Sequence, residues 1–211
     1  MKKLFLVSII VFGVFTTANA QFYAGAGLGI GLSNYLPSSD SQSPSSSYFA
    51  LNLLPEFGYI ITPKISLGVN LGVNLGINTS EYNGLSNDYV TSTSSYEFAP
   101  YARFSVVRYK GFALQAQGDV FVSGSKSTTT YNDITNTNES YLNFGLRVAP
   151  RLSYDISKHF TLFTKLNFLS LRFITSVDNN TKDVRTNFNL SGNTSNIINL
   201  DGLSIGMLYV F

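Results

Sequence analysis

The sequence predicts an all-β protein: an eight-stranded antiparallel up-and-down transmembrane β-barrel that follows a cleaved signal peptide. Three observations predict this fold class. Only 12% of the 211 residues are charged although 44% are hydrophobic, and this charged share is about half that of ordinary soluble domains. Apolar residues alternate with small or polar ones at the two-residue period of β-strands. The segments between the alternating stretches are long and short in turn, which is typical of membrane barrels.

The first 20 residues have the three parts of a secretory signal peptide. Lys2 and Lys3 form its positive start, residues 4–15 are apolar, and Ala-Asn-Ala at 18–20 matches an A-x-A cleavage site. An apolar stretch of about 12 residues is too short for a membrane-spanning helix, which needs roughly 20. We therefore expect residues 1–20 to be removed and residues 21–211 to form the barrel domain. No Cys follows the cleavage site, so we expect no lipoprotein anchor.

The alternation is clearest over residues 65–78. Ile, Leu and Val occupy every odd position there, whereas Ser, Gly and Asn occupy every even one. A strand places these two sets on opposite faces, but a helix would spread both around its surface. The same pattern predicts eight strands, over about 22–32, 48–60, 65–78, 95–108, 112–123, 141–153, 160–173 and 197–211.

The connections support an up-and-down barrel with one plain and one elaborate end. They run over about 33–47, 61–64, 79–94, 109–111, 124–140, 154–159 and 174–196. The long ones are rich in Ser, Thr, Asn and Asp, and the short ones hold turn residues such as Thr62-Pro63-Lys64. An even number of strands places both termini at the end with the short turns. The longest predicted loop, 174–196, includes Asp178, Lys182 and Arg185.

The two faces of the strands indicate a membrane barrel. A soluble barrel is apolar inside and charged outside, whereas a membrane barrel is apolar outside and polar inside. Here the face opposite the apolar residues is mostly Gly, Asn, Gln and Ser. Aromatic residues gather near the strand ends, as in interfacial girdles. A soluble periplasmic carrier of a lipophilic ligand, with the apolar face turned inward, is the alternative.

Three segments carry a resemblance to a known family. They are Gly-Tyr-Ile-Ile-Thr-Pro-Lys at 58–64, Phe-Ala-Pro-Tyr-Ala-Arg-Phe at 98–104, and a C-terminal strand with apolar or aromatic residues at Leu203, Ile205, Met207, Tyr209 and Phe211. Over residues 21–211 the chain resembles the outer-membrane beta-barrel domain family, of the small eight-stranded OmpA/OmpX kind. The resemblance implies a location in the cell outer membrane and recognition of the five C-terminal residues by the barrel insertion machinery. Fold alone does not give a function, and the family includes anchors and adhesion or resistance factors.

Strand parity assigns seven charged side chains to the interior. They are Glu56, Glu97, Arg103, Asp119, Arg147, Arg151 and Lys165. Arg103, Asp119 and Arg147 fall at similar heights on three consecutive predicted strands. Because an isolated buried charge costs several kcal/mol, we predict an internal ion-pair network that fills the barrel. A gated ion path or a proton relay is the functional alternative.

Residues suited to catalysis or cofactor binding are few. A chain without Cys cannot be a disulfide scaffold, a thiolate metal site or a c-type haem carrier. The one histidine, His159, lies near Asp155 and Ser157 in a predicted turn. Asp and Ser are common turn residues, which disfavours a hydrolase triad. No acidic cluster has the spacing of a calcium loop. We expect no catalysis, no cofactor and no metal.

Charge and loop composition bound the partners. The chain has 14 Lys and Arg and 12 Asp and Glu, and removal of Lys2 and Lys3 leaves the two signs equal. Nucleic acid is therefore not expected as a partner. We expect a monomer in outer-membrane lipid, with any extracellular ligand at the long loops. The main hypothesis is a structural or surface-interaction barrel. The alternatives are a narrow pore, a lipid-modifying barrel enzyme and the soluble carrier.

Overall fold

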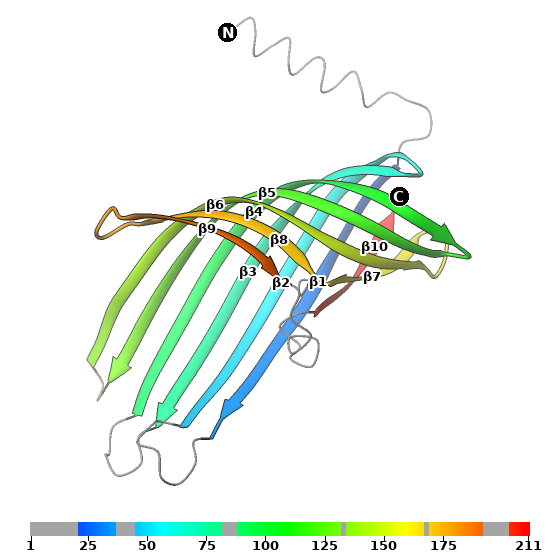
Figure 1. Ribbon diagram of the computed structural model, residues 1–211. Helices are drawn as coiled ribbons and strands as arrows, with labels where there is room; N and C mark the ends of the chain where they lie inside the picture. Colours follow the sequence, from blue (N-terminus) through cyan, green and yellow to red (C-terminus); the bar gives the residue numbers. More distant parts are fainter. Residues whose placement is uncertain (1–20, 37–44, 82–87, 132–133, 167–168, 192–202) are drawn as a thin grey trace, which may run out of the picture.

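The computed structural model describes residues 21–36, 45–81, 88–131, 134–166, 169–191 and 203–211. These residues form ten β-strands, so the predicted all-β antiparallel class is confirmed (Figure 1). The strands are β1 (Gln21–Tyr35), β2 (Ser45–Thr62), β3 (Ile65–Glu81), β4 (Asp88–Tyr109), β5 (Phe112–Tyr131), β6 (Ile134–Asp155), β7 (Phe160–Leu166), β8 (Ser170–Asp178), β9 (Val184–Ser191) and β10 (Leu203–Val210). No helix in these ranges is long and apolar enough to cross a membrane. The predicted signal peptide over 1–20, and positions 197–202 of the last predicted strand, lie outside the described residues.

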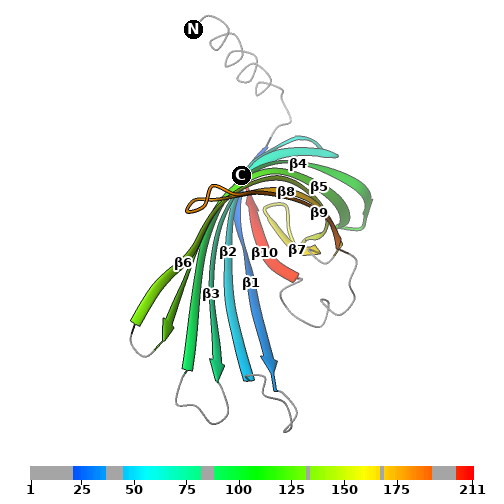
Figure 2. The same ribbon diagram turned by 60° about the vertical axis from the view of Figure 1, so that its left-hand side comes forward.

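Eight of the ten strands pair in a closed ring. β1 to β6 pair in chain order, β6 pairs with β7, β7 with β10, and β10 with β1. The closing ladder joins residues 23–28 of β1 to residues 205–210 of β10. β8 and β9 form a hairpin that continues along β6 beyond β7 (Figures 1 and 2).

The predicted strand count of eight is wrong in the last third of the chain. The strand predicted over 160–173 is two strands, because β7 pairs with residues 151–155 of β6 and β8 pairs with residues 141–148. The amide of Leu169 donates to the carbonyl of Leu166 at 3.1 Å, and the ladder along β6 is interrupted between β7 and β8. The loop predicted over 174–196 contains the end of β8 and all of β9, so Arg185 is a strand residue.

Two other predicted loops, 79–94 and 124–140, are mostly strand. β5 runs to Tyr131 and β6 starts at Ile134, so two residues connect them. The hydroxyls of Thr91 and Thr129 lie 3.0 Å apart across β4 and β5. Thr is β-branched, and Thr–Thr pairs stabilise neighbouring strands. The polar composition therefore reflects contact with water on both faces, and the chain stays in the sheet.

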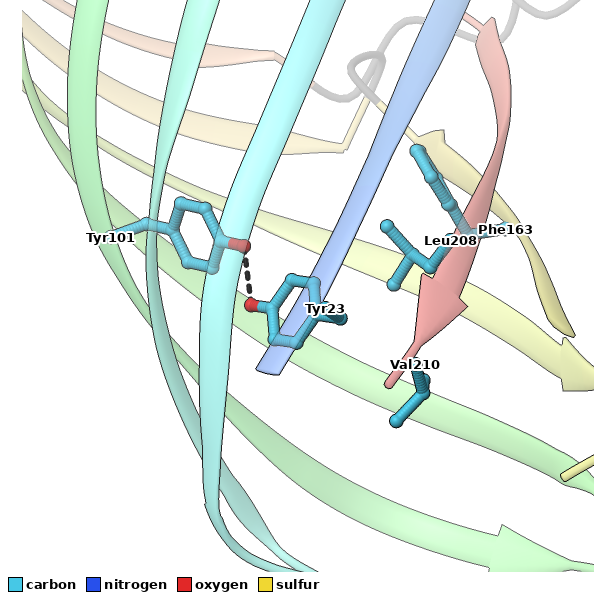
Figure 3. Packing of buried hydrophobic residues seen from close by; sticks show 5 residues of the cluster. All are labelled: Tyr23, Tyr101, Phe163, Leu208 and Val210. Atoms are coloured by element: carbon cyan, nitrogen blue, oxygen red, sulfur yellow. Dashed lines mark hydrogen bonds between the residues drawn. The ribbon is translucent and has the colours of Figure 1, made fainter. Parts of the chain in front are cut away.

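The faces of the ring are polar inside and apolar outside. Leu53, Val73 and Leu146 are 42%, 45% and 54% exposed on the outer face, whereas Glu56 is 0% exposed on the inner face. Five of the buried apolar residues form a small cluster inside the ring: Tyr23, Tyr101, Phe163, Leu208 and Val210 (Figure 3). The interior of this protein is consequently built mainly from polar side chains.

Candidate functional site

The seven charged residues that parity assigned to the interior all face the inside of the ring. They come from five strands: Glu56 from β2, Glu97 and Arg103 from β4, Asp119 from β5, Arg147 and Arg151 from β6, and Lys165 from β7. Side chains that point inward from neighbouring strands meet across a narrow lumen, since eight strands leave just enough room for side chains. The structure brings them together as two clusters of ion pairs and one flanking lysine.

The first cluster, the Glu56 cluster, consists of Glu56, Arg103 and Arg151. Nη1 of Arg151 donates to both carboxylate oxygens of Glu56, at 2.9 and 2.8 Å. Nη2 of Arg103 donates to Oε1 of Glu56 at 2.5 Å, and the Tyr101 hydroxyl donates to the same oxygen at 3.0 Å. Nζ of Lys165 lies 4.0 Å from Oε2, an ion pair beyond hydrogen-bond distance. The carboxylate of Glu56 thus forms ion pairs with three cations.

The second cluster, the Arg147 cluster, consists of Glu97, Asp119 and Arg147. Nε of Arg147 donates to Oδ2 of Asp119 at 2.8 Å, and Nη2 donates to Oε1 of Glu97 at 2.9 Å. The side chains of Arg147 and Glu97 are 22% and 17% exposed, so water reaches this cluster. Here two carboxylates pair with one cation, whereas in the Glu56 cluster one carboxylate pairs with several cations.

Gln117 of β5 connects the two clusters, and sequence reasoning missed it. Its Oε1 accepts from Nε and Nη2 of Arg103 at 3.2 and 3.1 Å, and its Nε2 donates to Oδ1 of Asp119 at 2.7 Å. An amide can do both because it has an acceptor and a donor end. The parity that placed Asp119 inside also applies to Gln117, two residues earlier. Gln117 carries no charge, so the pattern of charged residues alone does not include it.

Aromatic side chains close the space around the Glu56 cluster. The hydroxyls of Tyr23 and Tyr101 are hydrogen-bonded at 2.5 Å, as the dashed line in Figure 3 shows. A side chain at Gly68 would collide with the Tyr101 ring, so glycine there lets the tyrosine lie across the lumen. The guanidinium of Arg151 stacks 3.6 Å above the centroid of Phe163. These residues and the Glu56 cluster together form a partition across the ring.

The partition separates two cavities. The cavity at the short-turn end has a volume of about 390 Å³, and the cavity on the other side has a volume of about 480 Å³. Arg151 lines both, while Arg103 lines only the smaller and Arg147 only the larger. The larger cavity is also lined by Asn52, Asn70, Asn74, Lys165, Arg172 and Ser204.

Arg172 of β8 is a second interior residue that sequence reasoning missed. It pairs in register with Arg147 of β6 and Asn189 of β9. Its guanidinium lies 5.0 Å from the centroid of Phe121, and that of Arg147 lies 5.4 Å from the same ring. In the described part of the chain Arg172 makes no ion pair, and its Nε has no hydrogen-bond partner.

The residues weighed for a hydrolase triad each contact a different group. Nδ1 of His159 lies 2.9 Å from the carbonyl oxygen of Val210, and Asp155 accepts from the Thr161 hydroxyl at 2.7 Å. The Ser157 hydroxyl accepts from backbone amides of residues 159 and 160. No group of three or more metal-ligating side chains occurs among the described residues.

The C-terminal residues singled out in the sequence lie in or just after β10. Ile205, Met207, Tyr209 and Phe211 are 63%, 46%, 39% and 68% exposed on the outer face, and Leu203 starts the strand. The Tyr209 ring packs against His159 and Phe160, at centroid distances of 5.7 and 5.2 Å. β10 closes the ring through β1 and β7, so these residues sit at its closing strand.

Comparisons with known proteins do not assign the chain to a family. No protein-family model and no curated protein matches the chain. Among solved structures, Neisserial surface protein A (NspA) is similar over 92% of this chain and 99% of its own, with 13% identity and a TM-score of 0.44. A major outer membrane protein from Thermus thermophilus is similar over 91% and 99%, with 15% identity and a TM-score of 0.41. The outer membrane protease OmpT from Escherichia coli is similar over 93% and 100%, with 10% identity and a TM-score of 0.40. Structural similarity at TM-scores of 0.44 and lower does not indicate a function for this chain.

Proposed function

We propose that the chain is an integral outer-membrane β-barrel protein with a structural or surface-interaction role and no catalysis. The observation that carries the proposal is the inverted distribution of side chains. Ion pairs and amides fill the interior of the ring, whereas large apolar side chains cover its outside. This is the arrangement of a barrel whose outer solvent is lipid.

The apolar residues of the outer face form a continuous belt across the strands. Leu28, Leu53, Val73 and Tyr96 stand side by side in register on β1 to β4, and each is 42–69% exposed. In water the largest apolar patch of a typical monomer is about 300–600 Å², and a belt around the ring exceeds such a patch. Lipid stabilises the belt, and the closed ring leaves no strand of it without a neighbour on either side, as a bilayer requires.

The strands continue beyond this belt, which supports the surface-interaction part of the proposal. A tilted strand needs about 9–11 residues to cross a bilayer, but β4 and β6 have 22 residues each and β5 has 20. The outer face of β5 carries the exposed Lys126, in register with Ser94 of β4. From there to the hairpin ends both faces are rich in Ser and Thr. These polar extensions of β3 to β6 form the surface presented outside the membrane.

The exposed apolar residues of β10 support recognition by the barrel insertion machinery. Ile205, Met207, Tyr209 and Phe211 alternate along one outward face of the strand that closes the ring. A partner protein can recognise such a strand before the ring closes, because the edge and the apolar face of the strand are then both accessible.

Gel mobility of residues 21–211 in detergent, with and without boiling, tests the proposal together with cell fractionation. We expect a heat-dependent mobility shift and recovery in the outer-membrane fraction, because a ring with every strand paired resists SDS until it is heated. A protein that shows no shift and stays soluble after cell disruption would overturn the proposal and favour the periplasmic carrier.

A charge introduced into the belt tests its contact with lipid. Leu71→Arg, in the middle of the outer face of β3, should lower the free energy of unfolding in vesicles by about 2–4 kcal/mol. Ser92→Arg, on the polar extension of β4, is the control and should change it little. Urea titrations in lipid vesicles measure both. Equal effects of the two substitutions would contradict a lipid-facing belt.

A narrow pore is the second candidate, because the two cavities lie on either side of one partition. A pore requires the Glu56 cluster to open, since Arg151 contacts both cavities. Planar-bilayer recording distinguishes the two functions. A protein that inserts but gives no conductance steps supports the structural role, and steps that change in Glu97→Gln support the pore.

A further inference from the structure

The larger interior cavity has more positive than negative charge. Among the described residues, four cations line it, namely Arg147, Arg151, Lys165 and Arg172, against two acids, Glu97 and Asp119. Both acids bind Arg147. The carboxylate of Glu56, in the partition, is shared by Arg103 and Arg151, with Lys165 4.0 Å away. The acids of this region are therefore fully engaged, and positive charge is left over at Lys165 and Arg172.

The strand register places the cations next to one another. Arg147 of β6 stands opposite Arg172 of β8, and Arg151 of β6 stands opposite Lys165 of β7. Like charges directly opposite each other destabilise a strand pair. Glu97 and Asp119 offset Arg147, and Glu56 offsets Arg151, so the second member of each pair, Arg172 or Lys165, carries the surplus charge.

Several buried polar atoms around this cavity lack a partner in the described part of the chain. They are Nε and Nη2 of Arg151, Nδ2 of Asn70, Nε of Arg172 and the hydroxyl oxygen of Ser204, and all four residues line the cavity. Arg151 and Asn70 are each 1% exposed. Four of the five atoms are N–H donors, and buried donors without an acceptor are costly. An acceptor would satisfy these donors, and the surplus positive charge favours an anionic one.

We propose that the larger cavity binds an oxyanion of the phosphate class, held by Lys165, Arg172 and Arg151. Guanidinium groups bind phosphate oxygens through paired N–H donors, and Lys165 adds an ammonium group next to Asn70, with Nζ 3.2 Å from its Oδ1. A volume of about 480 Å³ admits a phosphate with an attached organic group, such as the headgroup of a lipid, as well as free phosphate. The site is formed inside the ring and does not depend on which solvent surrounds the outer face.

Titration calorimetry of the folded chain in nonionic detergent tests this site, with inorganic phosphate as the probe. We expect saturable binding that falls about tenfold in Arg172→Gln and in Lys165→Gln, as loss of one charge-assisted hydrogen bond predicts. Arg185→Gln, on the exposed strand β9 and away from the cavity, is the control and should bind like the wild type. No saturable binding, or equal binding by the double variant Arg172→Gln/Lys165→Gln, would overturn the proposal.

A second measurement separates binding from folding. Phosphate should raise the melting temperature of the wild-type chain, because a ligand that binds only the folded state stabilises it. Phosphate should not raise the melting temperature of the double variant, although the heat-dependent gel shift shows that this variant is folded. A phosphate-induced rise of equal size in both proteins would contradict the site. Glycerol 3-phosphate, compared with inorganic phosphate, identifies the source: tighter binding of the ester indicates a lipid headgroup, and equal binding indicates the free ion.

Discussion

The two ion-pair clusters of the interior contain the same chemical groups in different surroundings. In the Glu56 cluster the side chains of Glu56, Arg103 and Arg151 are 0%, 3% and 1% exposed. In the Arg147 cluster, Arg147 and Glu97 are 22% and 17% exposed. The first lies in the partition between the cavities, and the second faces the larger cavity. Depth in the lumen, rather than the number of ion pairs, distinguishes them.

This difference determines what each cluster contributes. A charge taken fully out of water must be compensated, and removing its partner leaves an uncompensated buried ion. A charge that water still reaches loses much less, because the solvent replaces the partner. We infer that the Glu56 cluster stabilises the closed ring and that the Arg147 cluster mainly shapes the cavity.

The largest effect is expected for Glu56→Gln. The substitution leaves Arg103, Arg151 and Lys165 without an acid, and we expect the free energy of unfolding to fall by about 3–5 kcal/mol. Urea unfolding in detergent measures it. Circular dichroism is the suitable signal, because the chain has no Trp. The same substitution at Glu97 is the matched control, and equal losses at the two positions would break the comparison.

Asp119→Ala should have an intermediate effect. The change removes one of the two acids on Arg147 and also the acceptor of Gln117 Nε2, while Glu97 still binds the arginine. We expect a loss of about 1–3 kcal/mol, seen as a lower unfolding temperature, with no change in any conductance. An unaltered melting curve would show that the link between the two clusters does not stabilise the ring.

Glu97→Gln should cost about 1 kcal/mol or less, since its ion pair with Arg147 is partly exposed and Asp119 remains. The difference between variant and wild type should shrink in high salt, because ions screen accessible pairs more than buried ones. Melting temperatures at low and high salt give this value. A salt-independent loss of stability as large as that of Glu56→Gln would show that the two clusters stabilise the ring equally.

Period-two alternation carried most of what could be predicted about the site. It assigns a side to every residue of an uninterrupted strand, and it placed Glu56, Arg103 and Asp119 on the inner face. The polar composition gave a wrong prediction where the strands extend beyond the apolar belt. The Ser and Thr residues of β4 and β5 predict loops, because polar residues are typical both of a loop and of a strand with water on both faces.

Arg172 could not be placed by counting from Lys165. Seven positions separate the two residues, so an unbroken strand would put them on opposite faces. In the structure six positions separate Lys165 from Leu171, while only three separate their partners Arg151 and Val148 on β6. The three extra residues on this side change the parity, and Arg172 turns inward. In the sequence this break coincides with two adjacent apolar residues, Phe168 and Leu169, at which the apolar positions change from even to odd numbers.

The smallest effect is expected where polar side chains meet water, on the extension of β4 and β5. Thr91→Val removes the hydroxyl contact with Thr129, and we expect a loss of only about 0.5 kcal/mol, because Val favours strands as Thr does and water solvates the remaining hydroxyl. Thr93→Val is the control, since the Thr93–Ser127 contact is longer, at 3.4 Å. Urea titration under the conditions used for Glu56→Gln measures both. A loss comparable to that of Asp119→Ala would mean that the extension unfolds together with the ring and is part of its stability.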